Sequence, residues 1–140
     1  MSCTDKKCVI IIDKELPLGL IANTSAILGC TLGKSMGSIV GEDVTDIDNF
    51  PHKGIVKIPI PILSSTKNKI KDFYTKIKEN YSKEVMVIDF NDTAQKCKVY
   101  DDYIQKLSCT DPSELNYLGI CLYGSKKIIT SLTGSLPTLK

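Results

Sequence analysis

Apolar residues follow two spacings along this chain, and together they predict strands that alternate with helices. Short runs in which nearly every residue or every second residue is apolar predict strands. These runs cover residues 7–12, 54–63, 84–90 and 115–124. Apolar residues three and four apart predict helices, which cover residues 18–32, 67–83, 92–107 and 125–134. Such alternation is typical of an α/β layered domain with helices on both faces of a sheet.

The first predicted helix lies in an uncharged run, residues 16–33, whose length meets the lower bound for a membrane span. The run is too polar for a span, because it contains a proline, an asparagine, two threonines, a serine and three glycines. Pro17 favours a helix start, and Gly33 predicts a C-cap. We therefore expect a helix packed on the sheet, with Asn23 and Thr24 facing a partner, a ligand or each other.

The strand predicted at residues 54–63 contains two prolines, Pro59 and Pro61. Each proline lacks an amide donor, and positions two apart point their backbone groups to the same side of a strand. A central strand cannot lose those donors. We therefore expect this strand at an edge of the sheet, with its outer rim blocked against pairing with further strands.

Length and composition fit one domain, residues 1–140, with 42% hydrophobic residues. The first residues are polar and charged, and the apolar run after them is too short for a secretory signal, so we expect a cytoplasmic protein. The six cysteines are scattered without a C-x-x-C pair, which favours free thiols. An acidic loop, residues 42–48, lacks the spacing of a calcium loop, so we expect neither a metal nor a cofactor.

All 18 basic residues are lysines, and the formal net charge is only +2. Without arginine the chain lacks the planar clamp that best reads guanine edges, so we expect no duplex DNA partner. The helix predicted at residues 67–83 nevertheless carries six lysines against two acids, with apolar residues on its opposite face. Lys67, Lys71 and Lys78 are candidate RNA contacts, and the alternative is a solvated outer face.

The junction between the strand at 84–90 and the next helix gathers polar side chains where open α/β sheets often place their sites. Asp89 and Thr93 are candidate catalytic residues that hold and deprotonate a water, with helix amides stabilising an oxyanion. Asn91 is a candidate pocket residue beside them. The alternative is structural: Asp92 caps the helix, and Gln95 completes a capping box. That alternative leaves Asp89 unexplained.

The order of several motifs resembles that of the type II peptidyl-tRNA hydrolases over nearly the whole chain. The motifs are "KCVIIID", "LPLG", "LIANTSAILG", "GIVKIPI", "VMVIDFNDT" and "YLGICLYGSKKIITSLTGSL". The chain resembles still more closely an uncharacterised bacterial family, domain of unknown function family 2000. The resemblance implies a three-layer α/β domain with a mixed four-stranded sheet, a homodimer, and in the hydrolases cleavage of the ester that joins a peptide to tRNA.

Carried over residue by residue, the resemblance is incomplete. Asp89 and Thr93 match an aspartate and threonine pair of the hydrolases, whereas Leu20 stands where their first-loop lysine would be. Leucine cannot stabilise a charged tRNA end or an oxyanion, so the hydrolase mechanism is incomplete unless another lysine substitutes. The resemblance also places Asn23 and Thr24 across a pocket from Asp89. The alternative is that they satisfy each other, nearby backbone or a subunit contact.

Three function classes therefore remain open. The first is hydrolysis of a peptidyl-tRNA or another acyl ester through Asp89 and Thr93. The second is non-catalytic binding of a small acyl ligand or an RNA end. The third is a dimeric interaction module in which the uncharged first helix joins two subunits.

Overall fold

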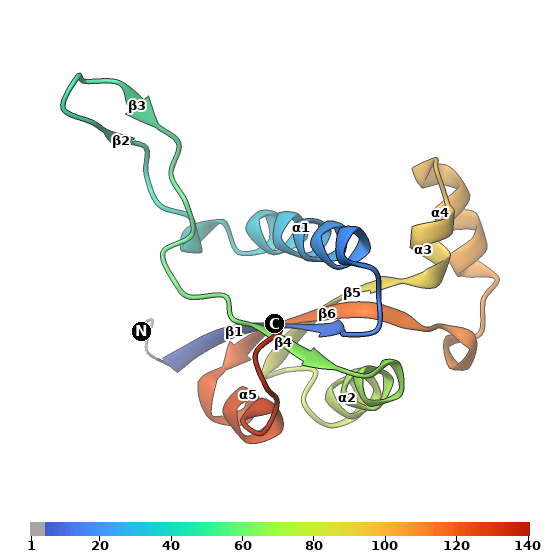
Figure 1. Ribbon diagram of the computed structural model, residues 1–140. Helices are drawn as coiled ribbons and strands as arrows, with labels where there is room; N and C mark the ends of the chain where they lie inside the picture. The colour runs from blue at the N-terminus through green and yellow to red at the C-terminus, as the bar shows by residue number, and fades with distance from the viewer. Residues whose placement is uncertain (1–4) are drawn as a thin grey trace.

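The computed structural model describes residues 5–140, which form a four-stranded sheet with helices on both faces (Figure 1). The strands of this sheet are β1 (Lys6–Asp13), β4 (Ile62–Ser65), β5 (Val85–Asn91) and β6 (Tyr117–Ser125). The α-helices are α1 (Leu18–Ser35), α2 (Lys67–Asn80), α3 (Asp92–Lys96), α4 (Tyr100–Ser108) and α5 (Lys126–Thr133). A second small sheet pairs β2 (Val44–Thr45) with β3 (Pro51–His52).

The sheet is mixed, and its strand order is β4-β1-β6-β5. β4 runs parallel to β1, whereas β6 runs antiparallel to both β1 and β5. The prediction of an α/β domain with a mixed four-stranded sheet is thus confirmed. Most residues of β1 and β6 are buried, because both strands lie inside the sheet and are covered on both faces.

Helix α1 covers one face of the sheet, and α2 and α5 cover the other (Figure 1). Along β1, Cys8, Ile10 and Ile12 face α1, while Val9 and Ile11 face the opposite core. α1 lies very close to β6. A Cβ atom added at Gly119 would lie 2.9 Å from the Thr24 methyl carbon and 2.7 Å from a methyl carbon of Ile12. Glycine at that position therefore lets the helix approach the strand.

Helix α1 is longer than the sequence predicted, and Gly33 is not its C-cap. The helix continues to Ser35, and the backbone amide of Met36 donates to the carbonyl of Leu32. The physical reason is that buried Leu28 and Leu32 anchor the last turns on the sheet, so tertiary packing outweighs the low helix propensity of one glycine. Among residues 5–140, no helix is both long enough and apolar enough to cross a membrane.

The strand predicted at residues 54–63 is mostly not a strand of the main sheet. Only Ile62–Ser65 forms β4, and residues 41–55 form a projecting hairpin, here called the arm (Figure 1). The arm leaves and re-enters the body through bonds from Gly41 N to Ile55 O and from Lys57 N to Ile39 O. The strand-like pattern of residues 55–61 belongs to the return path of the arm.

β4 lies at an edge of the sheet, as predicted, but the predicted blocking of its outer rim by Pro59 and Pro61 is wrong, because both prolines precede the strand. Pro61 lies just before the strand, and its carbonyl accepts from the amide of Ile10. The outer rim of β4 is covered by the end of the chain, since Ser64 N donates to Pro137 O and Leu139 N donates to Ile62 O. The opposite edge strand, β5, pairs only with β6 among the described residues.

The single helix predicted at residues 92–107 is two helices, α3 and α4, separated by residues 97–99. Cys97 and Val99 have extended backbone angles and break the helical path. Cysteine and valine have low helix propensity, and Val99 is 55% exposed, so no core contact holds this stretch in a helix. α3 and α4 rise beside α1 at the end of β5 (Figure 1).

Candidate functional site

A cavity of about 880 Å³ lies where α1 stops covering its face of the sheet. After Ser35 the chain turns away through a short 3₁₀ segment, η2 (Gly37–Ile39), and then enters the arm. The ends of β1, β6 and β5 beyond that point are left without a helix over them. Small-molecule sites are commonly concave, mostly apolar and of about 300–1,000 Å³, and this cavity falls within that range.

Four elements and two loops contribute to the cavity wall. Its lining residues are Lys6, Met36, Ser38, Ile39, Lys57, Ile58, Ser82, Lys83, Glu84, Met86, Tyr123 and Gly124. Most of them belong to segments that are far apart in the sequence.

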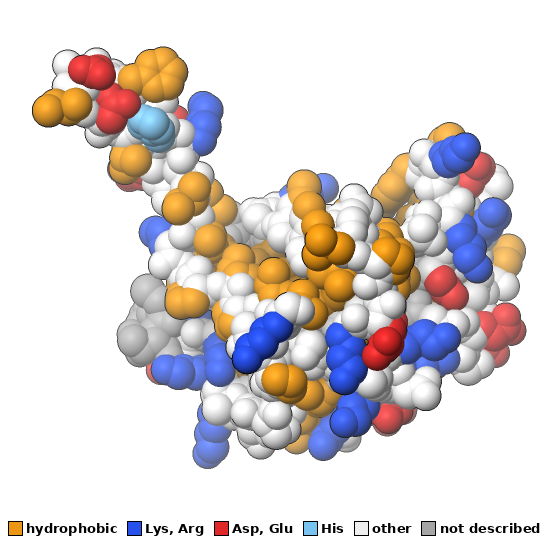
Figure 2. All heavy atoms as spheres, viewed as in Figure 1, with side chains coloured by type: hydrophobic (Ala, Val, Ile, Leu, Met, Phe, Trp, Pro, Cys, Tyr) orange, Lys and Arg blue, Asp and Glu red, His pale blue; other side chains and the backbone are white. Residues whose placement is uncertain are grey.

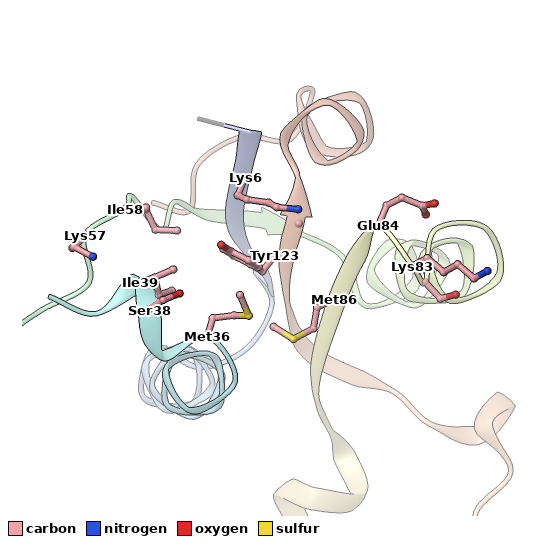
Figure 3. A pocket seen from close by; sticks show the side chains of 12 residues that line it. Lys6, Met36, Ser38, Ile39, Lys57, Ile58, Lys83, Glu84, Met86 and Tyr123 are labelled. Atoms are coloured by element: carbon pink, nitrogen blue, oxygen red, sulfur yellow. The ribbon is translucent and has the colours of Figure 1, made fainter. Parts of the chain in front are cut away.

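The centre of the wall is a row of side chains across three strands. Tyr123 of β6 is paired with Met86 of β5 on one side and with Cys8 of β1 on the other. Figure 3 shows Met36 and Met86 pointing toward each other, with Tyr123 and the Lys6 side chain beside them. Methionine side chains are unbranched and polarisable, so they adapt to apolar ligands of different shapes.

Most of the charged residues that line the cavity are lysines. Lys6, Lys57 and Lys83 line the cavity against one carboxylate, that of Glu84. Lys6 is half-buried, and its ammonium lies near the ring of Tyr123, whereas Lys83 and Glu84 lie on the far side and point away from the centre (Figure 3). The arrangement can hold an apolar body in the centre and an anionic group beside Lys6.

The polar groups of the cavity lining are hydroxyl, ammonium and carboxylate groups. The lining contains neither a histidine nor a cysteine. Its hydroxyls come from Ser38, Ser82 and Tyr123. An activated nucleophile needs a neighbouring base.

Asp89, the candidate catalytic carboxylate, lies elsewhere, near the end of β5. It is half-buried and accepts a hydrogen bond of 2.8 Å from Nδ2 of Asn91. Its side chain shares the α2 face of the sheet with Val85 and Val87, close to Tyr74 and Tyr117.

Two of these tyrosine rings pack against each other. The rings of Tyr74 and Tyr117 are stacked with their centres 4.5 Å apart. Burial, and then the nearby Asp89 carboxylate, raise the pKa of Tyr74. Burial, and then Tyr74, raise the pKa of Tyr117. Asp89 is thus surrounded by phenols that stay protonated at neutral pH.

The polar residues after Asp89 serve the backbone, and the predicted capping box is wrong. Asn91, 1% exposed, is the N-cap of α3, and its Oδ1 accepts from Ala94 N at 2.9 Å. Asp92 instead accepts from both nitrogens of Asn116 at 3.3 Å, and its own amide donates to Asn116 O. The backbone amides of Asp92 and Ala94, at the start of α3, are therefore already paired. Thr93, which lies between these two residues in the sequence, is half-buried.

Asn23 and Thr24, predicted to face Asp89, are not brought to it. Asn23 is exposed on the outer side of α1. Thr24 is fully buried against Gly119 on the α1 face of the sheet, whereas Asp89 shares the opposite face with Val85. The Thr24 hydroxyl has no hydrogen-bond partner within residues 5–140.

The three lysines predicted to contact RNA all lie on α2. Lys67 and Lys78 are exposed, while Nζ of Lys71 donates to the carbonyl of Ser113. Lysines gather over α2 and α5, on the side of the sheet away from α1 (Figure 2). RNA binding by this surface stays a prediction.

The acidic loop expected at residues 42–48 forms part of the arm. Asp46 accepts from the amides of Asp48 and Phe50 and lies 2.8 Å from Nε2 of His52. These bonds lower the pKa of Asp46, and the His52 bond has the largest effect. Within the part of the chain that the structure describes, no three histidine, cysteine or acidic side chains are grouped as a metal would require.

The cysteines of the described residues are free thiols, as predicted. Cys8 and Cys121 lie buried in neighbouring strands with their Sγ atoms 3.7 Å apart. Cys3 lies outside the described residues.

The comparisons with known proteins place the chain in a family. The sequence profile of the family described as "Protein of unknown function (DUF2000)" matches residues 6–140. The chain belongs to this family. A solved structure, the protein of unknown function Atu0240 from Agrobacterium tumefaciens strain C58, has a similar fold with a TM-score of 0.85 at 17% identity, covering 96% of this chain and 97% of that one. No curated protein matches.

The sequence analysis missed the cavity at the end of α1. The local signal was faint: Tyr123 is one of two tyrosines in a mostly apolar strand, and Met36 and Met86 are two of three methionines in the chain. Nothing in the sequence indicated that these side chains meet.

Proposed function

We propose that this protein is a binding protein for a small amphipathic anion, held in the cavity at the end of α1. The observation that carries the proposal is the combination of an apolar wall with a lysine rim in a cavity of about 880 Å³. An acyl chain or another apolar body contacts Met36 and Met86, and its carboxylate or phosphate lies beside Lys6. This function corresponds to the second of the three classes left open by the sequence.

The charge of the ligand is tested by calorimetric titration with three probes of one length: decanoate, decanol and decylammonium. Decanoate is expected to bind most tightly and decylammonium least. Lys6→Gln is expected to weaken decanoate binding about tenfold, because one charge-assisted hydrogen bond contributes about 1.5 kcal/mol. Lys76→Gln, which changes an exposed lysine on α2, is the matched control and leaves the affinity unchanged. Equal affinity for all three probes would refute the proposal.

Ester hydrolysis through Asp89 and Thr93 is the second candidate function. One observation favours it: Asp89 lines a separate cavity of about 600 Å³, with its carboxylate held in place by Asn91. The test is release of free tRNA from an N-acylated aminoacyl-tRNA, with Asp89→Asn measured beside the wild type. Turnover that is lost in Asp89→Asn would support this candidate, and absence of turnover by the folded wild type would reject it.

A further inference from the structure

Two cysteine thiols lie side by side in the core of the sheet. Cys8 of β1 and Cys121 of β6 are 1% and 0% exposed, and their Sγ atoms are 3.7 Å apart. Both side chains belong to the core on the α1 face. They are diagonal neighbours, because Cys8 pairs with Tyr123 and Cys121 pairs with Ile10. The register of two inner strands therefore fixes the separation of the two sulfur atoms.

The diagonal placement favours a shared ligand over a disulfide. Diagonal neighbours on antiparallel strands have Cα atoms about 7–8 Å apart, whereas disulfides usually join Cα atoms about 4.4–6.8 Å apart. Two sulfur atoms on one metal ion lie about 3.8–4.0 Å apart at tetrahedral or trigonal angles, since a metal–thiolate bond is about 2.3 Å long. The observed separation of 3.7 Å is close to that spacing. The pair can therefore share an ion with little movement of the strands.

The surroundings of the pair are apolar and contain further sulfur atoms. Met36 and Met86 pack against the same core cluster as the two cysteines. Figure 3 shows the two methionine side chains pointing toward each other beside Tyr123, which is the strand neighbour of Cys8. Among biological metal ions, soft thiolate and thioether groups select Cu(I), whereas hard ions such as Mg²⁺ and Ca²⁺ prefer oxygen.

A small cavity gives an ion a route to the pair. Cys8 lines this cavity, whose volume is about 290 Å³. Its charged lining residues are Lys6, Lys7 and Lys126, and no acidic side chain of residues 5–140 lines it. A Cu(I) ion with two thiolates carries one net negative charge, which nearby lysines stabilise. The hydrogen bond with Cys121 also lowers the pKa of Cys8, and this favours the thiolate that binds metals.

We propose that Cys8 and Cys121 together bind one Cu(I) ion. Each thiol gives its proton to solvent and each sulfur forms one bond to copper, so two protons are released and copper stays monovalent. Cu(I) forms stable complexes with only two thiolates, so the pair suffices although residues 5–140 hold no metal-binding group of three histidine, cysteine or acidic side chains. The two cysteines are 113 positions apart, so their spacing predicts no metal site. Neither thiol lines the anion cavity at the end of α1, which makes this a separate site.

The test is a competition titration against the Cu(I) chelator bicinchoninate under reducing, oxygen-free conditions. A background variant keeps only the pair, because the other four cysteines are replaced: Cys3→Ser, Cys30→Ser, Cys97→Ser and Cys109→Ser. This variant is expected to take up one Cu(I) per chain. Adding Cys8→Ala or Cys121→Ala is expected to abolish the uptake. Val9→Ala, which shortens a buried side chain in the opposite core, is the matched control and keeps the uptake.

Two further measurements separate a metal site from a loss of folding. Circular dichroism is recorded for every variant, and Cu(I) is expected to raise Tm of the background variant and of Val9→Ala but not of Cys8→Ala. X-ray absorption of the loaded background variant is expected to show sulfur ligands at about 2.3 Å from copper. No uptake by the folded background variant, uptake that survives replacement of either cysteine, or copper bound without sulfur would each overturn the proposal and leave the pair as core packing.

Discussion

Replacing Thr24 by valine should stabilise the protein. The Thr24 side chain is fully buried and its hydroxyl has no partner among residues 5–140. A buried polar group without a hydrogen bond costs about 1–3 kcal/mol, and valine has nearly the same shape and helix propensity as threonine. We expect the free energy of unfolding to rise by about 1 kcal/mol or more, and Tm by about 3 °C per kcal/mol.

Thr133 provides the matched control. It is also buried in a helix, but its hydroxyl donates to the carbonyl of Ile129 at 2.7 Å. Thr133→Val loses that bond and should lower stability by about 0.5–1.5 kcal/mol. Both variants are measured by urea denaturation with circular dichroism. If Thr24→Val destabilises the protein as much as Thr133→Val does, the Thr24 hydroxyl has a partner and the reasoning is wrong.

Three further predictions concern other parts of the chain. Gly119→Ala should destabilise the protein by about 1–3 kcal/mol in chemical denaturation, because the new Cβ would overlap Ile12 and Thr24; an unchanged midpoint would show that α1 can move away. Asn91→Ala should cost about 1–2 kcal/mol through loss of the α3 cap and of the Asp89 bond, and Asn91→Asp, which keeps the cap oxygen but places a second carboxylate against Asp89, should cost more. Because the pKa of Asp46 is lowered in the folded protein, its ionised carboxylate stabilises the arm at pH values above the unfolded pKa of about 3.9. This stabilisation is lost as the pH falls through the folded pKa. An NMR titration that follows the Phe50 amide should report the loss, and an amide signal that does not change below pH 4 would contradict the prediction.

Much of the fold could be predicted because its signals are local. The apolar runs of β1, β5 and β6 and the stripe of α2 predict their elements within a few residues of the observed bounds. Ser125 caps α5 through its hydroxyl, and Gly134 ends that helix, as the sequence indicated. Local composition alone decides such features.

The errors in the fold share one cause: contacts between residues that are far apart in the sequence determine the observed structure. Residues 55–61 have a strand-like pattern, but they return from an arm that has no counterpart in the hydrophobic periodicity. Gly33 continues α1 because Leu32 is anchored in the core.

The candidate site was the least predictable part. The motif around Asp89 was visible because its residues are adjacent in sequence, and the structure shows that Asn91 and Asp92 mainly hold backbone groups there. The cavity at the end of α1 combines Lys6, Met36, Met86 and Tyr123, whose convergence depends on strand order and on where α1 ends. Neither the strand order nor the end of α1 has a local signal in a single sequence.

The most direct test of the proposed function uses the methionine methyl groups as reporters. Met36 and Met86 face each other in the cavity, and they are two of only three methionines in the chain (Figure 3). In a methyl-labelled NMR spectrum, titration with decanoate is expected to shift both resonances in a saturable way, and Lys6→Gln is expected to require more decanoate for the same shift. Resonances of Met36 and Met86 that do not move with decanoate would contradict the account.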